Sequence, residues 1–81
     1  MAQVTAAGRR LRIWRKQNKY SQFKLAVAIG YTTHDAIAKF ETGQRALPVV
    51  KLCLLEEITG ISAEQLAGAE QAEEIAIIRG T

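Results

Sequence analysis

Cysteine, proline and histidine each occur only once in this chain of 81 residues. The single cysteine, Cys53, excludes an internal disulfide, and the single histidine, His34, has no partner ligands with which to hold zinc. We therefore expect no disulfide, no metal site and no other cofactor. Cys53 lies in an apolar run (LCLLEEI), so we interpret it as a small core residue, with a reactive thiol or an intermolecular bridge as the alternative.

Long apolar runs and catalytic groupings are missing as well. No stretch approaches the ~20 apolar residues of a membrane-spanning helix, and the N-terminus carries no apolar signal segment. No nucleophile–base pair, phosphate-binding loop or cluster of metal ligands can be identified, which argues against an enzyme. We therefore expect a soluble, cytoplasmic protein without enzymatic activity.

Acidic residues are scarce in the first half of the chain, and basic residues are scarce in the second half. Residues 1–50 contain nine Lys and Arg residues against two acidic residues, a net charge of +7. Residues 51–81 contain two basic residues against six glutamates, a net charge of −4. A basic half attracts polyanions, whereas an acidic half is repelled by them. The first half is therefore the part in which we expect contact with nucleic acid.

The apolar residues, 48% of the chain, recur with helical spacing, and no stretch alternates with the period of a strand. In the first helix, an apolar stripe runs through Val4, Ala7, Leu11 and Trp14. We expect an all-α bundle of five helices in one domain over residues 1–81, with its core over about 5–67. The predicted helices are about Thr5–Asn18, Ser21 to Gly30, after Tyr31 to Gly43, after Pro48 to Gly60, and from Ser62 over Leu66.

Residues that favour helix ends support these boundaries. Ser21 is a good N-cap for the second helix, and Ser62 with Gln65 forms a capping box for the fifth. Thr32 or Thr33 is the expected cap of the third helix, with Asp35 in a capping-box position.

The C-terminal extension, residues 68–81, allows two structures. Its Ala and Glu content favours a helix, while the segment Ile75–Ile78 is also compatible with an edge strand. Its isoleucines are too apolar for a free tail, so they cover the core or meet a second copy of the chain. The candidates for a dimer contact are Leu66, Ile75, Ile77 and Ile78.

The segment Ser21–Gly43 predicts a short helix, a turn containing Gly30 and a second short helix, all within the basic half. A helix-turn-helix presents its second helix to the major groove of DNA. Residues from about Gly8 to Leu66 resemble the Cro/CI-type helix-turn-helix family, or XRE family, of phage and bacterial regulators. The resemblance rests on Leu11, Arg15, Ser21, Gln22, Leu25, Ala26, Gly30, Ile37, Glu41, Gly43, Pro48 and the segment Gly60–Ser62.

This resemblance implies a λ-repressor-like bundle and assigns roles to individual residues. Gln22 binds a phosphate and braces the third helix, and Arg15 and Glu41 form an internal salt bridge. The implied DNA-contacting residues are Gln22, Thr32, Thr33, His34, Asp35, Ala38, Lys39, Thr42, Gly43 through its amide, and Arg45. The turn after Gly30 is one residue longer than in the common family pattern, which leaves Thr32 and Thr33 as alternatives for one position.

The side chains at the front of the third helix have the chemistry to recognise bases. Lys39 can donate to guanine, Asp35 can accept from cytosine N4, and His34 can contact a purine N7. Two of these residues have a simpler interpretation. Asp35 suits a first helical turn because it complements the helix dipole, and Lys39 suits any solvated surface.

We therefore expect a sequence-specific regulator of transcription that binds double-stranded DNA. The expected form is a homodimeric repressor or autoregulator of phage, restriction-modification controller or antitoxin type, on a palindromic operator. The alternative is a protein-interaction module that keeps the same helical bundle without reading DNA. Such a module would use Trp14, Tyr31 or the apolar C-terminal segment.

Overall fold

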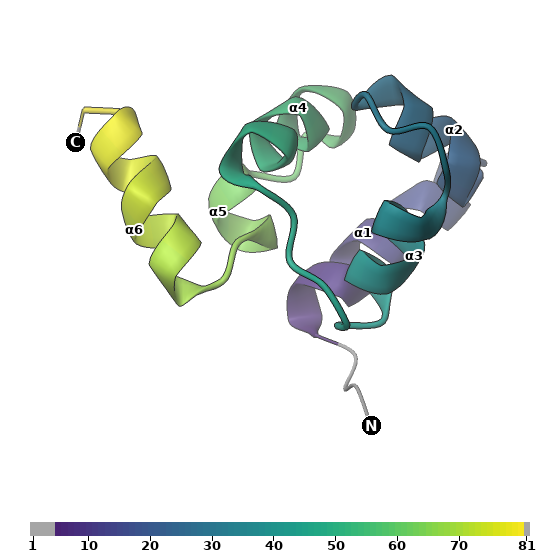
Figure 1. Cartoon of the computed structure of the whole chain (residues 1–81), viewed down its shortest axis with the longest axis horizontal. Coiled ribbons are helices and arrows are strands. Elements are labelled where there is room, and N and C mark those ends of the chain that lie inside the picture. The colour runs from purple at the N-terminus through teal and green to yellow at the C-terminus, as the bar shows by residue number, and fades with distance from the viewer. Residues whose placement is uncertain (1–4, 81) are drawn as a thin grey trace.

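A computed structural model describes residues 5–80, and every regular element in that range is a helix. The all-α fold class is therefore confirmed. The expected C-terminal extension forms a sixth helix, and not a strand (Figure 1). Val4, expected in the apolar stripe of the first helix, lies outside the described residues. The helices are α1 (Ala6–Gln17), α2 (Gln22–Ala28), α3 (Asp35–Glu41), α4 (Val49–Thr59), α5 (Ala63–Leu66) and α6 (Ala69–Ile78).

Most helix ends follow local side-chain chemistry. The Ser21 hydroxyl accepts a hydrogen bond from the backbone N–H of Lys24 at 2.9 Å, which makes Ser21 the predicted N-cap of α2. The Ser62 hydroxyl accepts from the N–H of Gln65 at 3.2 Å at the start of α5. Gly60, with a φ of 75°, ends α4 in the left-handed conformation that glycine adopts without strain.

The start of α3 differs from the prediction. The helix begins at Asp35, and His34 stands at the N-cap position with no side-chain hydrogen bond to the helix. The expected cap at Thr32 or Thr33 is therefore wrong. The reason is the lengthened turn after Gly30, because it places both threonines before the N-cap position, too early to cap the first amides.

Every helix contributes to one apolar core. The fully buried large side chains are Leu11, Leu25, Ile29, Ile37, Leu47, Leu52, Leu55, Leu66 and Ile75. Leu66 and Ile75 retain 2% and 1% exposure, so the core of the same chain already covers them and we withdraw them as dimer contacts. Packing within the chain explains why these two residues are apolar. Ile77 and Ile78 remain exposed at 75% and 71%.

The helices are arranged so that α3 and α6 lie apart. Helix α2 packs on α3, α3 packs on α1, and α6 packs on α4 and α5. Along the longest axis of the molecule, α6 occupies the opposite end from α2 and α3 (Figure 1). No helix in the described part of the chain is long and apolar enough to cross a membrane.

An ion-pair network fastens the end of α6 to α4 and α5. The Arg79 guanidinium lies 2.7 Å from Glu56 and 3.3 Å from Glu64. Glu56 also accepts a hydrogen bond from the backbone N–H of Ala63 at 2.7 Å. This backbone hydrogen bond, followed by the bond from Arg79, lowers the pKa of the Glu56 carboxyl below its ordinary value.

We expect acid to loosen this attachment of α6. Because the pKa of Glu56 is lowered in the folded state, its contribution to stability is complete above the pKa of an unfolded glutamate. That contribution is lost as pH falls through the folded-state pKa, in the interval below the ordinary pKa of a glutamate. Hydrogen exchange of α6 amides, measured between neutral pH and that interval, should show opening of α6 before the rest. In Glu56→Gln the α6 amides should lose most of this pH dependence, and an unchanged profile would contradict the prediction.

Candidate nucleic-acid interface

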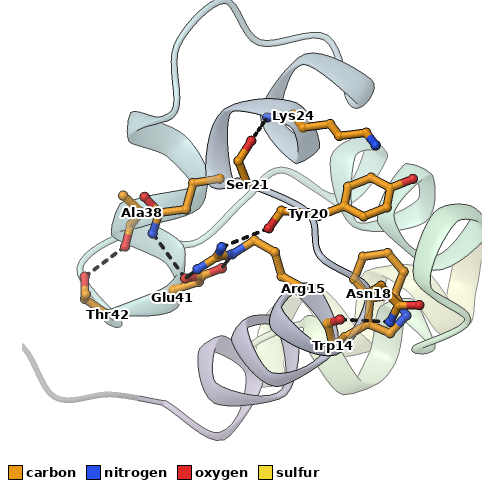
Figure 2. Close-up of polar contacts among 10 residues, drawn as sticks. Trp14, Arg15, Asn18, Tyr20, Ser21, Lys24, Ala38, Glu41 and Thr42 are labelled. Carbon is orange, nitrogen blue, oxygen red and sulfur yellow. Dashed lines mark hydrogen bonds and ion pairs between the residues drawn. The ribbon is translucent and has the colours of Figure 1, made fainter.

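A buried carboxylate connects the three helices that build the candidate interface. Glu41, at the end of α3, retains 3% exposure. It accepts hydrogen bonds from Arg15 Nε at 2.7 Å and Arg15 Nη2 at 3.1 Å, and from Gln22 Nε2 at 3.2 Å. Arg15 comes from α1 and Gln22 opens α2, so the Arg15–Glu41–Gln22 cluster fixes α3 against both helices. Figure 2 shows the Arg15 guanidinium against the carboxylate.

The cluster accounts for two roles that the resemblance implied. The Arg15–Glu41 salt bridge is present, and the Arg15 guanidinium also donates to the backbone carbonyl of Tyr20 at 3.0 Å (Figure 2). Gln22 braces α3 through Glu41, as expected. Its amide has two N–H donors, so one stays available to a phosphate at the start of α2.

Gly8 sets how closely α1 approaches α3, a role that the sequence analysis missed. A Cβ at this position would lie 2.6 Å from the carbonyl oxygen of Phe40 and 2.7 Å from that of Glu41. Both neighbours are backbone atoms, which cannot move aside as a flexible side chain would. The available signal was the glycine itself, because glycine inside a helix is disfavoured unless close contact requires it.

Replacing Gly8 with alanine should destabilise the fold although it improves helix propensity. Alanine gains about 1 kcal/mol over glycine in a helix, whereas overpacking costs about 1–3 kcal/mol. The cost of overpacking exceeds the gain in helix propensity because α1 must separate from α3. We therefore expect the free energy of unfolding, measured with urea, to fall by up to about 2 kcal/mol. Gly68→Ala is the control, since its Cβ would meet only the Gln71 side chain at 3.9 Å. Equal stability of Gly8→Ala and the wild type would show that the close approach is unimportant.

The front of α3 is open to solvent. Of the predicted contacts in this region, Thr32, Thr33, His34, Asp35 and Lys39 are exposed, and Ala38 is half-buried. The His34 and Asp35 side chains are 59% and 62% exposed, with Nε2 and Oδ1 3.6 Å apart. Within the described residues Lys39 forms no ion pair and no side-chain hydrogen bond. The structure therefore brings an imidazole, a carboxylate and an ammonium group to one accessible surface.

The loop after α3 offers fewer contacts than the resemblance implied. Gly43, with a φ of 79°, donates its N–H to Phe40 at 3.1 Å, and Gln44 donates to Lys39 at 2.9 Å. These are the two hydrogen bonds of a Schellman motif, which uses the Gly43 amide to close the helix. We therefore remove the Gly43 amide from the expected phosphate contacts. The motif explains the glycine by helix termination.

The Thr42 hydroxyl is also directed toward the protein. It donates to the backbone carbonyls of Ala38 and Lys39, both at 3.2 Å, and the contact with Ala38 is visible in Figure 2. Its oxygen can still accept, but a phosphate needs a donor. Arg45 is exposed and is the remaining predicted DNA contact of this loop. Its guanidinium carbon lies 6.0 Å from the centre of the Tyr31 ring.

Lys51 on α4 holds the turn between α2 and α3, and the sequence analysis gave it no role. Its ammonium donates to the carbonyl of Ile29 at the end of α2, at 2.7 Å. The same nitrogen lies 5.0 Å from the centre of the Tyr31 ring. The turn residue Gly30 passes so close that a Cβ there would lie 2.9 Å from the ammonium. A lysine inside the apolar run VVKLCLL was the signal that could have identified it.

We expect Lys51→Met to lose about 1.5–3 kcal/mol of unfolding free energy. The methionine keeps much of the aliphatic stem, so the loss reports the charged hydrogen bond to Ile29 and the cation over Tyr31. Thermal and urea unfolding would measure it. Lys39→Met is the matched control, because Lys39 has no side-chain partner among the described residues, and its unfolding midpoint should stay near that of the wild type. A Lys51→Met protein as stable as this control would refute the role.

The comparisons with known proteins agree with this geometry. A family model described as helix-turn-helix matches residues 11–66, which run from within α1 to the end of α5. The sequence finds no match among curated proteins and none among solved structures. The matched range contains the Arg15–Glu41–Gln22 cluster and the whole exposed front of α3, while α6 lies beyond it. The chain therefore belongs to the Cro/CI-type, or XRE, helix-turn-helix family of DNA-binding transcription regulators.

Proposed function

We propose that this regulator recognises a specific operator by inserting α3 into the major groove. The observation that carries the proposal is the exposed front of α3, mounted on a helix whose other end is fixed by the buried Glu41 carboxylate. A rigidly mounted helix places its side chains against bases in one register. Mobile side chains on a loosely held helix would bind DNA with little preference.

Each residue of this surface has a proposed task. His34, Asp35 and Lys39 contact base edges, because their side chains are exposed to solvent at the front of α3. Gln22 and Arg45 bind phosphates and set the position of the protein on the duplex. Thr32, Thr33 and Ala38 are close enough in the chain to add contacts with sugars, phosphates or thymine methyl groups.

The proposed functional unit is a homodimer on a palindromic operator. One recognition helix of 7 residues spans only a few base pairs, so one copy has little information to read. Ile77 and Ile78, exposed on α6, are the apolar residues proposed for the dimer contact. The regulator would act in the cytoplasm of a bacterium as a repressor or autoregulator of phage, restriction-modification or antitoxin type.

A selection from random duplexes tests the proposal most directly. We expect recovery of an inverted repeat with half-sites about one helical turn apart. Light scattering should give a complex that contains two chains of 8.9 kDa each. The selected operator and a scrambled duplex would then be titrated at two salt concentrations. Equal affinity for both duplexes at both salt concentrations would reject sequence-specific binding.

A further inference from the structure

We propose that α1 carries a second phosphate-binding surface, which extends the DNA footprint beyond the segment contacted by α3. The surface consists of Arg9, Arg12 and Lys16, called the α1 ridge below. This inference rests on the proposed function and adds residues that neither the sequence analysis nor the family resemblance assigned to DNA.

The three side chains of the α1 ridge are exposed and unpaired. Arg9, Arg12 and Lys16 are all solvent-exposed, and none forms an ion pair or side-chain hydrogen bond with another described residue. Within residues 1–50, the only carboxylates are Asp35 and Glu41. Glu41 is already neutralised by Arg15. The remaining acidic residues belong to positions 56–74, in the part of the chain that forms α4 to α6.

The turn of α1 directs the α1 ridge away from the core. Leu11 is fully buried in the core, and Gly8 and Arg15 face α3. Successive residues of an α-helix are rotated by about 100°. Moving around α1 from Leu11, one passes Gly8 and Arg15 and then reaches the α1 ridge. The α1 ridge therefore lies beyond the contact with α3, on the side of α1 that points away from the core.

The same order holds around α3. Its residues Ala36, Ile37 and Phe40 face the core, and Glu41 faces α1. Asp35 and Lys39 occupy the side that points away from the core. Helices α1 and α3 contact each other and pack on the same core. The sides of the two helices that point away from this core therefore lie on the same face of the molecule. A duplex seated on the front of α3 would thus have one phosphate strand near the α1 ridge.

The length and charge of the α1 ridge suit a phosphate strand. The α1 ridge runs over eight residues, from Arg9 to Lys16, and covers about 10 Å along the helix. Successive phosphates of one strand are about 3.4 Å apart along the DNA axis. The ridge can therefore face about three phosphates. Cations that have no carboxylate partner release DNA counterions without first breaking an ion pair. DNA contact on this surface adds affinity and salt dependence without adding base recognition.

The test compares the wild type with four variants on the selected operator. The ridge variant carries Arg9→Gln, Arg12→Gln and Lys16→Gln, and glutamine preserves helix propensity. The conservative variant carries Arg9→Lys and Arg12→Lys, which keeps the charge. The position control is Arg10→Gln, to be compared with Arg12→Gln alone, because Arg10 lies on the opposite side of α1 and reaches the Gln65 carbonyl at 3.4 Å. Circular dichroism and thermal unfolding of each protein would show that it is folded.

The measured quantity is the slope of log affinity against log salt concentration. We expect the ridge variant to lose about 2–3 units of slope, because each phosphate contact contributes about 0.9. The conservative variant and Arg10→Gln should keep the wild-type slope, Arg12→Gln should lose about 1 unit, and the preference for operator over scrambled duplex should be unchanged in all.

Three outcomes would overturn the inference, and they can be told apart. A folded ridge variant with the wild-type slope and unchanged mass in light scattering means that the α1 ridge does not touch DNA, although the proposed function stands. A variant with the wild-type slope that has lost a complex between copies in light scattering means that the ridge binds an acidic protein surface. A wild-type protein that binds operator and scrambled duplex equally, or binds neither, removes the proposed function together with this inference.

Discussion

Replacing Glu41 with alanine should cost about 3–5 kcal/mol of unfolding free energy, the largest loss we expect from one substitution. The carboxylate retains 3% exposure and accepts three hydrogen bonds, two from Arg15 and one from Gln22. Alanine removes these bonds and leaves the Arg15 guanidinium, whose side chain is only 12% exposed, without its counter-charge. Since small domains have about 5–15 kcal/mol of stability in total, urea unfolding should begin at clearly lower denaturant concentrations.

A double variant separates the contribution of the ion pair to stability from the cost of leaving the buried Arg15 guanidinium without a counter-charge. Arg15→Met with Glu41→Leu replaces both partners by apolar side chains of similar length. Such a replacement of a buried pair is often neutral or stabilising, whereas removal of one partner is strongly destabilising. We therefore expect the double variant to unfold at a higher urea concentration than Glu41→Ala. If Glu41→Ala alone unfolds at the wild-type midpoint, the pair does not hold the helices together.

The same substitution should affect recognition beyond its effect on stability. The Arg15–Glu41–Gln22 cluster joins α1, α2 and α3, so its loss releases the end of α3 from two helices at once. At a temperature where Glu41→Ala is still folded, we expect the ratio of operator affinity to scrambled-duplex affinity to fall. The double variant should recover part of this ratio only if packing, and not the charge itself, positions α3.

Local signals predicted most helix ends, whereas they could not predict contacts between residues far apart in the chain. Ser21 and Ser62 each cap the amide three positions later, a distance that any helix fixes in advance. Gly8 meets Phe40 only because α1 and α3 cross in the folded state. The Arg15–Glu41 pair is 26 positions apart and was expected from the family resemblance alone. Lys51 likewise gained its role from the fold, because it reaches a carbonyl 22 positions away.

Apolar residues near the C-terminus show a second limit of sequence analysis. Leu66, Ile75, Ile77 and Ile78 have similar hydropathy, so their types alone do not distinguish a core from an interface. The structure buries Leu66, which ends α5, in the core. On α6 it buries Ile75 and exposes Ile77 and Ile78, because α6 turns one side toward α4 and α5. The length of the turn after Gly30 had a similar effect. It was noticed in the sequence, but its consequence, an α3 that begins without a threonine cap, depends on three-dimensional geometry.

Lys39 and Arg45 should differ in what their loss does to DNA binding. Lys39 stands at the front of α3, so Lys39→Ala should cost about 1–3 kcal/mol on the operator and relax the preference at one base pair. Arg45 follows the helix, so Arg45→Ala should weaken binding to operator and scrambled duplex alike and reduce the salt slope by about 1. Because the residues have no shared partner, both substitutions together should cost about 2–4 kcal/mol, a loss of about 30- to 1,000-fold in affinity.

This contrast depends on where each cation lies, which makes it a sharp test of the interface. A selection repeated with Lys39→Ala should recover operators that vary at one position of each half-site, whereas Arg45→Ala should recover the wild-type operator. Arg10→Ala serves as the control cation, since it lies on the side of α1 away from α3 and should leave both affinities nearly unchanged. If Lys39→Ala weakens operator and scrambled duplex by the same factor, Lys39 binds a phosphate. Base recognition would then rest on His34 and Asp35, the two side chains that remain exposed at the start of α3.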